Sequence, residues 1–300
     1  MKLTVPESII SRVSIWKGKE VEHKSLSGGL SNINFTCTVE NKKFVLRIPG
    51  EGTEVFIDRG NEKGAILATS QLGVSPDLLG IVIPENAMVL PFVEGEVMNP
   101  GVIAADNGII VKIVNVLKKV HTGAVFEKRT YVFDMIREYT KLARQKDAFF
   151  PHDFDWMCHV ADKIEKAMDR NKPELAACHN DVLSENFILD ESGKMWLLDW
   201  EYCGMNDPFF DLGDFAVEHP LSRKQEEMIA ETYCGEMLPH QLYRILLHKL
   251  TADLWWSLWA MIQNQTSNLD FDYYGYGIGR YARFRENYYD PGFDTWLSEV

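Results

Sequence analysis

Residues 179–201, with the sequence HNDVLSENFILDESGKMWLLDWE, carry the strongest signal in the chain. Asp181 is followed five residues later by Asn186, and Asp199 comes after two apolar runs separated by a turn. This order of residue types is typical of enzymes that transfer a phosphoryl group from a magnesium-bound nucleotide. Asp181 would accept the proton of a substrate hydroxyl, and Asn186 and Asp199 would hold the metal ion. The alternative interpretation is that all three are ordinary polar residues in turns.

A β-hairpin would bring two of these residues together. The two short apolar runs are typical of strands, and residues 191–194 supply turn residues between them. If Asp190 faces Met195, the constant sum of facing positions places Asn186 opposite Asp199. Neighbouring strands lie about 4.8 Å apart, so two oxygen ligands would meet at the open end of the hairpin. A one-residue shift of the register would remove this pairing.

The composition limits the classes of protein to which the chain can belong. Its 300 residues are 46% hydrophobic, which is enough for one large or two modest domains. Lysine and arginine number 31 against 44 acidic residues, and the net charge is −13. Such a surface repels phosphate backbones, so we expect no nucleic-acid partner, and it suits a cationic substrate.

Cysteines and hydropathy indicate the compartment. The five cysteines are dispersed without paired spacing, which favours reduced thiols over disulfides or a zinc site. No segment approaches about 18 uninterrupted apolar residues, and the N-terminus lacks the pattern of a signal peptide. We therefore expect a cytoplasmic protein that does not insert into membranes.

The secondary-structure pattern changes near residue 95. Residues 20–92 contain five short β-branched or aromatic runs and one helical stretch at about 58–72. From about residue 102 the apolar residues follow helical periodicity. Further helices are expected at roughly 131–145, 155–169, 222–236, 240–263 and 278–289. We predict an α+β protein with a sheet-rich N-terminal lobe at residues 1–94, a helical C-terminal lobe at residues 95–300, and a ligand cleft between them.

A glycine-containing segment between two expected strands is a candidate phosphate-binding loop. Glycines let the backbone approach a ligand closely, and free amides and small hydroxyls can bind phosphate oxygens. The candidate residues of this segment are Ser27, Gly28, Gly29, Ser31 and Asn32. The alternative is an ordinary Gly-Gly hairpin turn, because the segment matches neither the Walker pattern nor the dinucleotide fingerprint.

Arg47, Glu62 and Phe92 are further candidates for nucleotide binding. Arg47 ends an expected strand, where a protein kinase would place its phosphate-binding lysine, and a planar guanidinium suits phosphate oxygens. Glu62 on the following helix would orient Arg47. Phe92 follows the last strand of the N-terminal lobe, where a hinge would offer backbone groups to adenine. The alternatives are a surface cation, an ordinary helical acid and a core aromatic residue.

Aromatic residues gather in the C-terminal part. Trp256 and Trp259 are three residues apart in a helical stretch and therefore share a face. Tyrosines follow in residues 273–276, which we expect to form a loop, and Tyr202 lies just beyond the hairpin. Such rings can enclose a quaternary ammonium through cation–π attraction, worth roughly 0.5–2 kcal/mol per ring. The alternative is that this aromatic stripe belongs to the core.

Together these segments resemble the choline/ethanolamine kinases, most closely the bacterial choline kinases of surface-glycan decoration. The segments that carry the resemblance are 27–35, 44–50, 52–53, 179–186, 198–202, 206–212, 256–259 and 272–280. The resemblance covers nearly the whole chain. It implies the bilobal protein-kinase-like fold that this family shares with aminoglycoside phosphotransferases.

The resemblance also implies roles for the candidate residues. Asp181 would be the catalytic base, and Asn186 and Asp199 would bind magnesium beside ATP in the cleft. The substrate would be a small cationic amino alcohol in an aromatic pocket. The residues that match this pocket are Tyr202, Trp256, Trp259 and Tyr276, with Glu201 as a polar neighbour.

We therefore expect an ATP-dependent kinase that phosphorylates the hydroxyl of choline to give phosphocholine. The alternative substrate is another small alcohol (ethanolamine, thiamine or an aminoglycoside), because a primary ammonium needs hydrogen-bond acceptors and a trimethylammonium needs aromatic walls. The alternative class is a kinase-like binding module without catalysis. His179 and Asp211 are expected to brace the catalytic loop, and the oligomeric state stays open.

Overall fold

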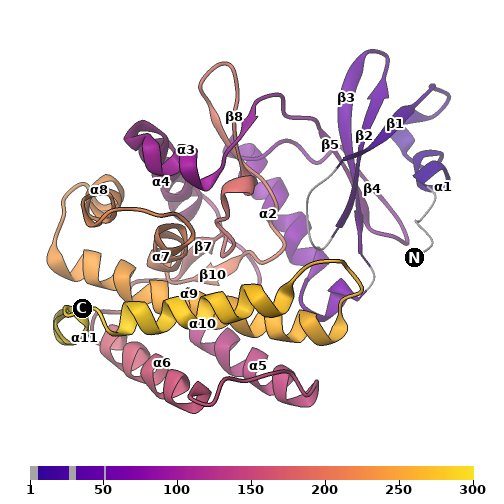
Figure 1. The fold of residues 1–300 in the computed structure, drawn as a ribbon. Helices are drawn as coiled ribbons and strands as arrows, with labels where there is room; N and C mark the ends of the chain where they lie inside the picture. The colour runs from indigo at the N-terminus through magenta and orange to yellow at the C-terminus, as the bar shows by residue number, and fades with distance from the viewer. Residues whose placement is uncertain (1–5, 27–31, 51) are drawn as a thin grey trace.

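The computed structural model describes residues 6–26, 32–50 and 52–300. A small sheet lies on one side of the molecule and helices form most of the remainder (Figure 1). The sheet is antiparallel, with the strand order β1-β2-β3-β5-β4. Its strands are β1 (Glu22–Leu26), β2 (Asn32–Val39), β3 (Lys42–Pro49), β4 (Gly80–Val82) and β5 (Ala87–Pro91). The predicted α+β class and the five predicted strands are confirmed.

The N-terminal sheet is held by alternating burial and one capped helix. In β2, the buried residues Phe35, Cys37 and Val39 alternate with partly exposed ones, as in a strand with one face on a core. The short helix α1 (Pro6–Ile10) contributes Ile9 to that core. Helix α2 (Arg59–Gln71) begins after Asp58, whose carboxylate accepts hydrogen bonds from the first backbone amides of the helix.

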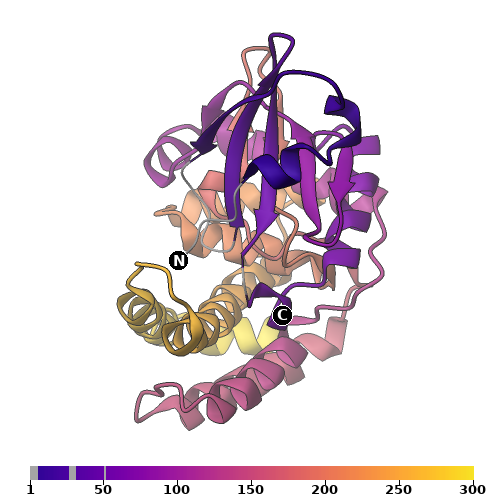
Figure 2. The ribbon, with the colours of Figure 1, turned by 90° about the vertical axis from the view of Figure 1, so that its right-hand side faces the viewer.

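Helices make up most of the chain after residue 99. They are α3 (Pro100–Ala105), α4 (Asn107–Gly123), α5 (Val132–Gln145), α6 (Phe154–Met168), α7 (Pro208–Glu218), α8 (Arg223–Cys234), α9 (Pro239–Thr266), α10 (Tyr273–Tyr288) and α11 (Phe293–Glu299). Helices α9 and α10 run side by side, and the view from the side of the sheet shows them nearly end-on below the strands (Figure 2).

The prediction that residues 273–276 form a loop is wrong, because they form the first turn of α10. The side chain of Asp272 accepts a hydrogen bond from the Gly275 amide and caps this helix. A Cβ atom added to Gly277 would lie only 2.4 Å from the Cε atom of Met261 on α9. A side chain here would displace the end of Met261, so glycine favours close packing of the two helices despite its low helix propensity.

The predicted hairpin is present, but its register differs by one residue from the predicted one. Strand β8 (Phe187–Leu189) pairs with β9 (Met195–Leu197), and Leu189 faces Met195. Asp190 thus faces Lys194, and Asn186 pairs with Leu198 instead of Asp199. The physical reason is a tighter turn, in which the Asp190 carboxylate accepts hydrogen bonds from the amides of Ser192 and Lys194.

The division after residue 94 stays a prediction. The five-stranded sheet ends at Pro91, and the next strand, β6 (Glu96–Val97), pairs with β8 in a separate three-stranded sheet. A cavity of about 290 Å³ lies between Asn32 and Thr53 of the N-terminal part and Gln263 near the end of α9. Within the described residues, no helix combines the length and apolar character that a membrane span requires.

Candidate active site

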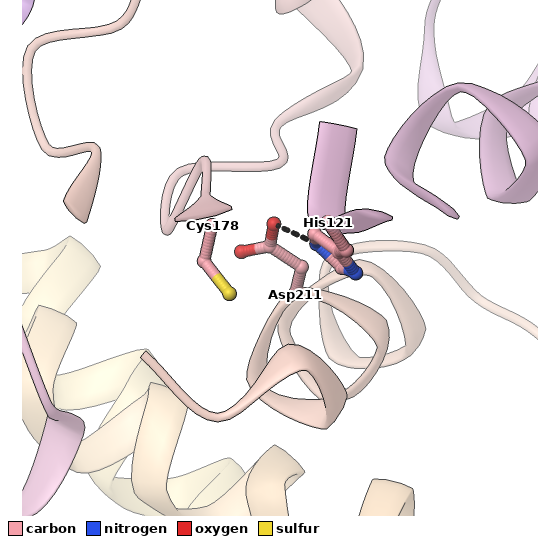
Figure 3. A group of neighbouring side chains, drawn as sticks. All are labelled: His121, Cys178 and Asp211. Carbon is pink, nitrogen blue, oxygen red and sulfur yellow. Dashed lines mark hydrogen bonds and ion pairs between the residues drawn. The ribbon is translucent and has the colours of Figure 1, made fainter. Parts of the chain in front are cut away.

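The loop that carries Asp181 runs from β7 (Ala176–Cys178) to β8 and is held by two buried carboxylates of α7, Asp211 and Asp214. Asp214 accepts a hydrogen bond from the backbone amide of Val182 at 3.1 Å. Asp211, on α7, accepts hydrogen bonds from the backbone amides of His179 and Asn180, each at 2.8 Å. The ring of His121 on α4 contacts the same carboxylate at 2.9 Å (Figure 3). The prediction that Asp211 braces the catalytic loop is confirmed.

Cys178 completes a buried group with His121 and Asp211, and its side chain lies beside the carboxylate in Figure 3. His, Cys and Asp are metal-ligating residue types, but the oxygens of Asp211 already accept three hydrogen bonds. Burial, together with the nearby carboxylate of Asp211, raises the pKa of the Cys178 thiol well above its ordinary value. The hydrogen bonds that Asp211 accepts from the loop and from His121 give this group a structural role.

His179 also has a structural place in the loop. Its Nε2 lies 2.8 Å from the carbonyl oxygen of Leu198, and its Nδ1 accepts a hydrogen bond from the Asp181 amide at 3.3 Å. These partners require a neutral ring with the proton on Nε2. Burial lowers the pKa of His179, which favours that neutral form. The expectation that His179 braces the loop is confirmed.

Asp181, Asn186 and Asp199 converge despite the shift in register. The side-chain amide of Asn186 donates to the carbonyl oxygen of Asp181 at 2.8 Å, and its backbone carbonyl accepts from Leu198, the neighbour of Asp199. Burial and the carboxylate of Asp199 raise the pKa of Asp181 well above its ordinary value. A carboxylate with a raised pKa is a stronger proton acceptor. The chemical roles of the three residues stay predictions.

The oxygen atoms of Asn186 and Asp199 suit a hard cation. Because the nitrogen of the Asn186 amide donates to Asp181, its oxygen is the atom of this group that can serve as a ligand. Asp199 offers a carboxylate, and magnesium prefers such oxygen ligands. The donor set therefore fits the predicted ion.

Two arginines meet three carboxylates where the sheet faces this loop. Arg47, on β3, lies 2.5 Å from Asp199, 3.1 Å from Glu201 and 3.3 Å from Glu62. Arg59, at the start of α2, contacts Glu62 at 2.8 Å and Glu201 at 2.7 Å. The side chains of Glu62 and Glu201 are almost fully buried, so their charges need these partners. Arg47 is thus no surface cation.

The remaining nucleotide candidates divide into two groups. Ser27, Gly28, Gly29 and Ser31 lie outside the described residues. Asn32 donates to the carboxylate of Glu201 at 2.9 Å. The backbone amide of Phe92 donates to the carbonyl oxygen of Lys43 at 3.1 Å, so this amide is engaged by the neighbouring strand. A role of Phe92 toward adenine stays a prediction.

The four aromatic residues predicted for the substrate pocket lie together. The ring centroids of Tyr202 and Trp256 are 4.9 Å apart, those of Trp256 and Trp259 are 5.9 Å apart, and those of Trp259 and Tyr276 are 6.2 Å apart. The indole of Trp259 donates to the Tyr202 hydroxyl at 2.7 Å. We call these four residues the aromatic box. Tyr202 and Tyr276 are close enough to Asp181 for its charge to affect the pKa of both phenols.

Several residues at this site carry no recognisable signal in the sequence. Arg280 donates to the hydroxyl of Tyr276, and Glu218 forms an ion pair with Arg280. Arg59 and His121 are tied to the site by the contacts described above. A charged residue near an aromatic pattern is too common to be singled out. Its partner lies elsewhere in the sequence, so no local pattern marks the pair.

Replacing Asp211 with asparagine tests the brace. We expect the free energy of unfolding to fall by about 2–3 kcal/mol, because the amide cannot accept all three hydrogen bonds and loses the charge that strengthens them. Urea denaturation measures this change. The exposed Asp294 in α11 is the control position, and Asp294→Asn should change stability by less than about 0.5 kcal/mol. Equal stability of the two variants would contradict the assignment.

Known proteins resemble this chain over most of its length. The choline/ethanolamine kinase family model matches residues 23–234. A choline/ethanolamine kinase family protein from Mesorhizobium loti is 32% identical, with a TM-score of 0.85 and coverage of 97% of this chain and 96% of that one. The choline kinase LicA from Streptococcus pneumoniae is 26% identical, with a TM-score of 0.79 and coverage of 94% and 98%.

A further relative is an ethanolamine kinase. Ethanolamine kinase 2 from Mus musculus is 24% identical over 297 residues, which are 90% of this chain and 77% of the relative. The agreement with the solved structures confirms the protein-kinase-like fold. The chain belongs to the choline/ethanolamine kinase family and is a small-molecule kinase.

Proposed function

We propose that this kinase transfers the γ-phosphoryl group of ATP to the hydroxyl of choline and produces phosphocholine. One observation supports choline over other amino alcohols. The Tyr202 oxygen accepts a hydrogen bond from Trp259 at 2.7 Å, and the Tyr276 oxygen accepts one from Arg280. With both phenol oxygens engaged, the aromatic box offers ring faces more than hydrogen-bond acceptors. Ring faces attract a trimethylammonium group, whereas a primary ammonium needs acceptors.

In this proposal, each residue of the site has a separate role. Asp181 takes the proton of the choline hydroxyl, and its raised pKa suits that task. Arg47, oriented by Glu62, binds phosphate oxygens of the nucleotide. Asn186 and Asp199 hold magnesium, which when bound neutralises charge on the phosphate groups.

Further parts of the proposal concern the nucleotide, the aromatic box and the cellular location. The residues assigned to the phosphates are those of the segment from Ser27 to Asn32, and the residue assigned to adenine is Phe92. Glu201 adds negative charge beside the box and holds the arginines in place. A cytoplasmic location fits a kinase that uses ATP.

A phosphorylation assay with choline, ethanolamine, thiamine and an aminoglycoside tests the function. We expect kcat/KM for choline to exceed that for ethanolamine by at least about tenfold, since tenfold corresponds to about 1.4 kcal/mol, the size of one or two cation–π contacts. The assay measures ADP formation at saturating ATP and magnesium. A tenfold preference for ethanolamine would reject choline but keep the kinase assignment.

Ethanolamine is the second candidate because of the similarity to the mouse ethanolamine kinase. Carboxylates also stand near Asp181, and Glu218 is among those that raise its pKa. They could accept hydrogen bonds from a primary ammonium. A non-catalytic binding module is disfavoured, because Asp181, Asn186 and Asp199 are all present and lie together.

A further inference from the structure

The two arginines at the junction of the sheet and the catalytic loop share their carboxylate partners unequally. Arg47 contacts three carboxylates, with Asp199 at 2.5 Å and Glu201 and Glu62 at 3.1 and 3.3 Å. Arg59 contacts the same two glutamates at shorter distances, 2.7 and 2.8 Å. The glutamates are therefore held more closely by Arg59, and the closest partner of Arg47 is Asp199.

This pairing of Arg47 with Asp199 differs from the roles proposed for the two residues. Asp199 is the proposed metal ligand and Arg47 is the proposed phosphate ligand, yet the two side chains bind each other in this structure. Arg47 is only 9% exposed. A guanidinium and a divalent cation at one carboxylate repel each other strongly where water is largely excluded. Binding of a nucleotide with its metal ion therefore favours a state in which Arg47 has moved from Asp199 to a phosphate oxygen.

Arg59 determines how strongly the glutamates oppose that movement. The side chains of Glu62 and Glu201 are 0% and 2% exposed, and a buried carboxylate that loses its cationic partner is strongly destabilising. Within the part of the chain that the structure describes, only Arg47 and Arg59 form ion pairs with Glu62. With Arg59 in place, Arg47 can move without leaving Glu62 unpaired. Without Arg59, Glu62 would hold Arg47 where it is.

Arg59 has contacts that keep its orientation while Arg47 moves. Its Nη1 atom donates to both glutamates, and its Nη2 atom donates to the hydroxyl of Thr53 at 2.7 Å. That hydroxyl in turn donates to the carbonyl oxygen of Gly50 at 2.8 Å. Arg59 is also the first residue of α2. It therefore joins the helix to the segment that follows β3 through groups that do not involve Arg47.

We propose that Arg59 is a positioning residue, which holds the two buried glutamates so that Arg47 can exchange Asp199 for a phosphate oxygen of the nucleotide. This exchange frees the Asp199 carboxylate for the metal ion. The ligand class is a nucleoside triphosphate with a divalent cation. The inference rests on the proposed functions of Arg47 and Asp199, but it does not depend on the identity of the acceptor.

Nucleotide binding tests the role of Arg59 without any acceptor. A fluorescent ATP analogue is titrated into the wild type and into Arg59→Met in the presence of magnesium. The Kd should rise by about tenfold in the variant, a typical coupling between neighbouring charged groups. Arg59→Lys keeps the charge and should bind within about threefold of the wild type. If folded Arg59→Met binds the nucleotide as tightly as the wild type, the inference is overturned.

A double variant distinguishes this role from general stabilisation of the site. Arg59→Met with Glu201→Gln removes one charge of each sign, so Arg47 is held less tightly than in Arg59→Met. The nucleotide Kd of the double variant should be lower than that of Arg59→Met. If the two changes weaken binding additively, Arg59 only stabilises the site and the inference is overturned. Arg285→Met is the control, because Arg285 pairs with Asp153 before α6, and its Kd should stay within about twofold.

Metal binding without nucleotide tests the competition at Asp199 and needs no variant of Arg59. The electron paramagnetic resonance signal of free Mn²⁺ measures binding of the ion alone. Arg47→Met removes the guanidinium from Asp199 while Arg59 still holds the glutamates, so the Kd for Mn²⁺ should fall by at least about threefold. If the Kd is unchanged, Arg47 does not compete with the metal ion and the inference is overturned.

Failure of this inference and failure of the proposed function give different results. If the wild type binds no ATP and phosphorylates no amino alcohol, the proposed function fails and the inference fails with it. If the wild type phosphorylates an amino alcohol but Arg59→Met leaves nucleotide binding unchanged, only the role of Arg59 is overturned.

Discussion

Replacing Asp181 with asparagine is expected to lower kcat for choline by roughly 10²- to 10⁴-fold, the usual contribution of a positioned general base. Asparagine has nearly the same size, so the loop held by Asp211 should keep its conformation. The variant loses the negative charge of the side chain and its ability to take the hydroxyl proton. Initial rates at saturating ATP and magnesium measure kcat, and a fluorescent nucleotide measures binding, which should change by less than about threefold.

The matched control for this variant is Asp294→Asn, the same exchange at an exposed position in α11. It should retain the kcat of the wild type. Thermal unfolding of both variants shows whether the fold is intact. If Asp181→Asn turns over choline at the rate of the wild type, Asp181 is not the base and the proton leaves by another route.

Much of this site follows from local sequence patterns. The two apolar runs with turn residues between them predict the hairpin, and the strands lie where the pattern places them. The predicted register is wrong because turn residues mark a reversal without fixing how many residues it contains. Here Asp190 accepts hydrogen bonds from Ser192 and Lys194, and Gly193 adopts a φ of 83°, so the turn closes one residue earlier.

Ion pairs between residues that are far apart in the sequence cannot be predicted from local sequence patterns. Arg59 and Glu201 are 142 residues apart in the sequence, yet they lie 2.7 Å apart in the structure. The chain offers 31 basic and 44 acidic residues, so the sequence alone gives no reason to choose this pair. Glu62 could be predicted because protein kinases place an acid on the helix that follows the strand of the phosphate-binding residue, here Arg47. No such pattern marks Arg59.

The error in residues 273–276 has a different origin. Glycines at 275, 277 and 279 favour a loop when the segment is considered alone. Packing against α9 reverses that preference, because the missing side chain at Gly277 leaves room for Met261. Local propensity is a weak guide wherever two helices must approach closely.

Replacing Asp199 with asparagine is expected to lower kcat by roughly 10²- to 10³-fold. The amide keeps the size of the side chain but loses the charge that would hold magnesium. The magnesium concentration that gives half-maximal activity should therefore rise by at least about tenfold. Arg47 loses one of its carboxylate partners but keeps Glu62 at 3.3 Å and Glu201 at 3.1 Å, so β3 should stay in place. Magnesium titrations of initial rates measure both effects.

Asp190→Asn is the control, because Asp190 lies at the opposite end of the same hairpin and holds its turn. This variant perturbs the hairpin without touching the proposed metal ligands, so its magnesium dependence should match that of the wild type. If Asp190→Asn shifts the magnesium titration as far as Asp199→Asn does, the loss comes from a distorted hairpin. In that case, the charge of Asp199 would not explain the magnesium dependence of this kinase.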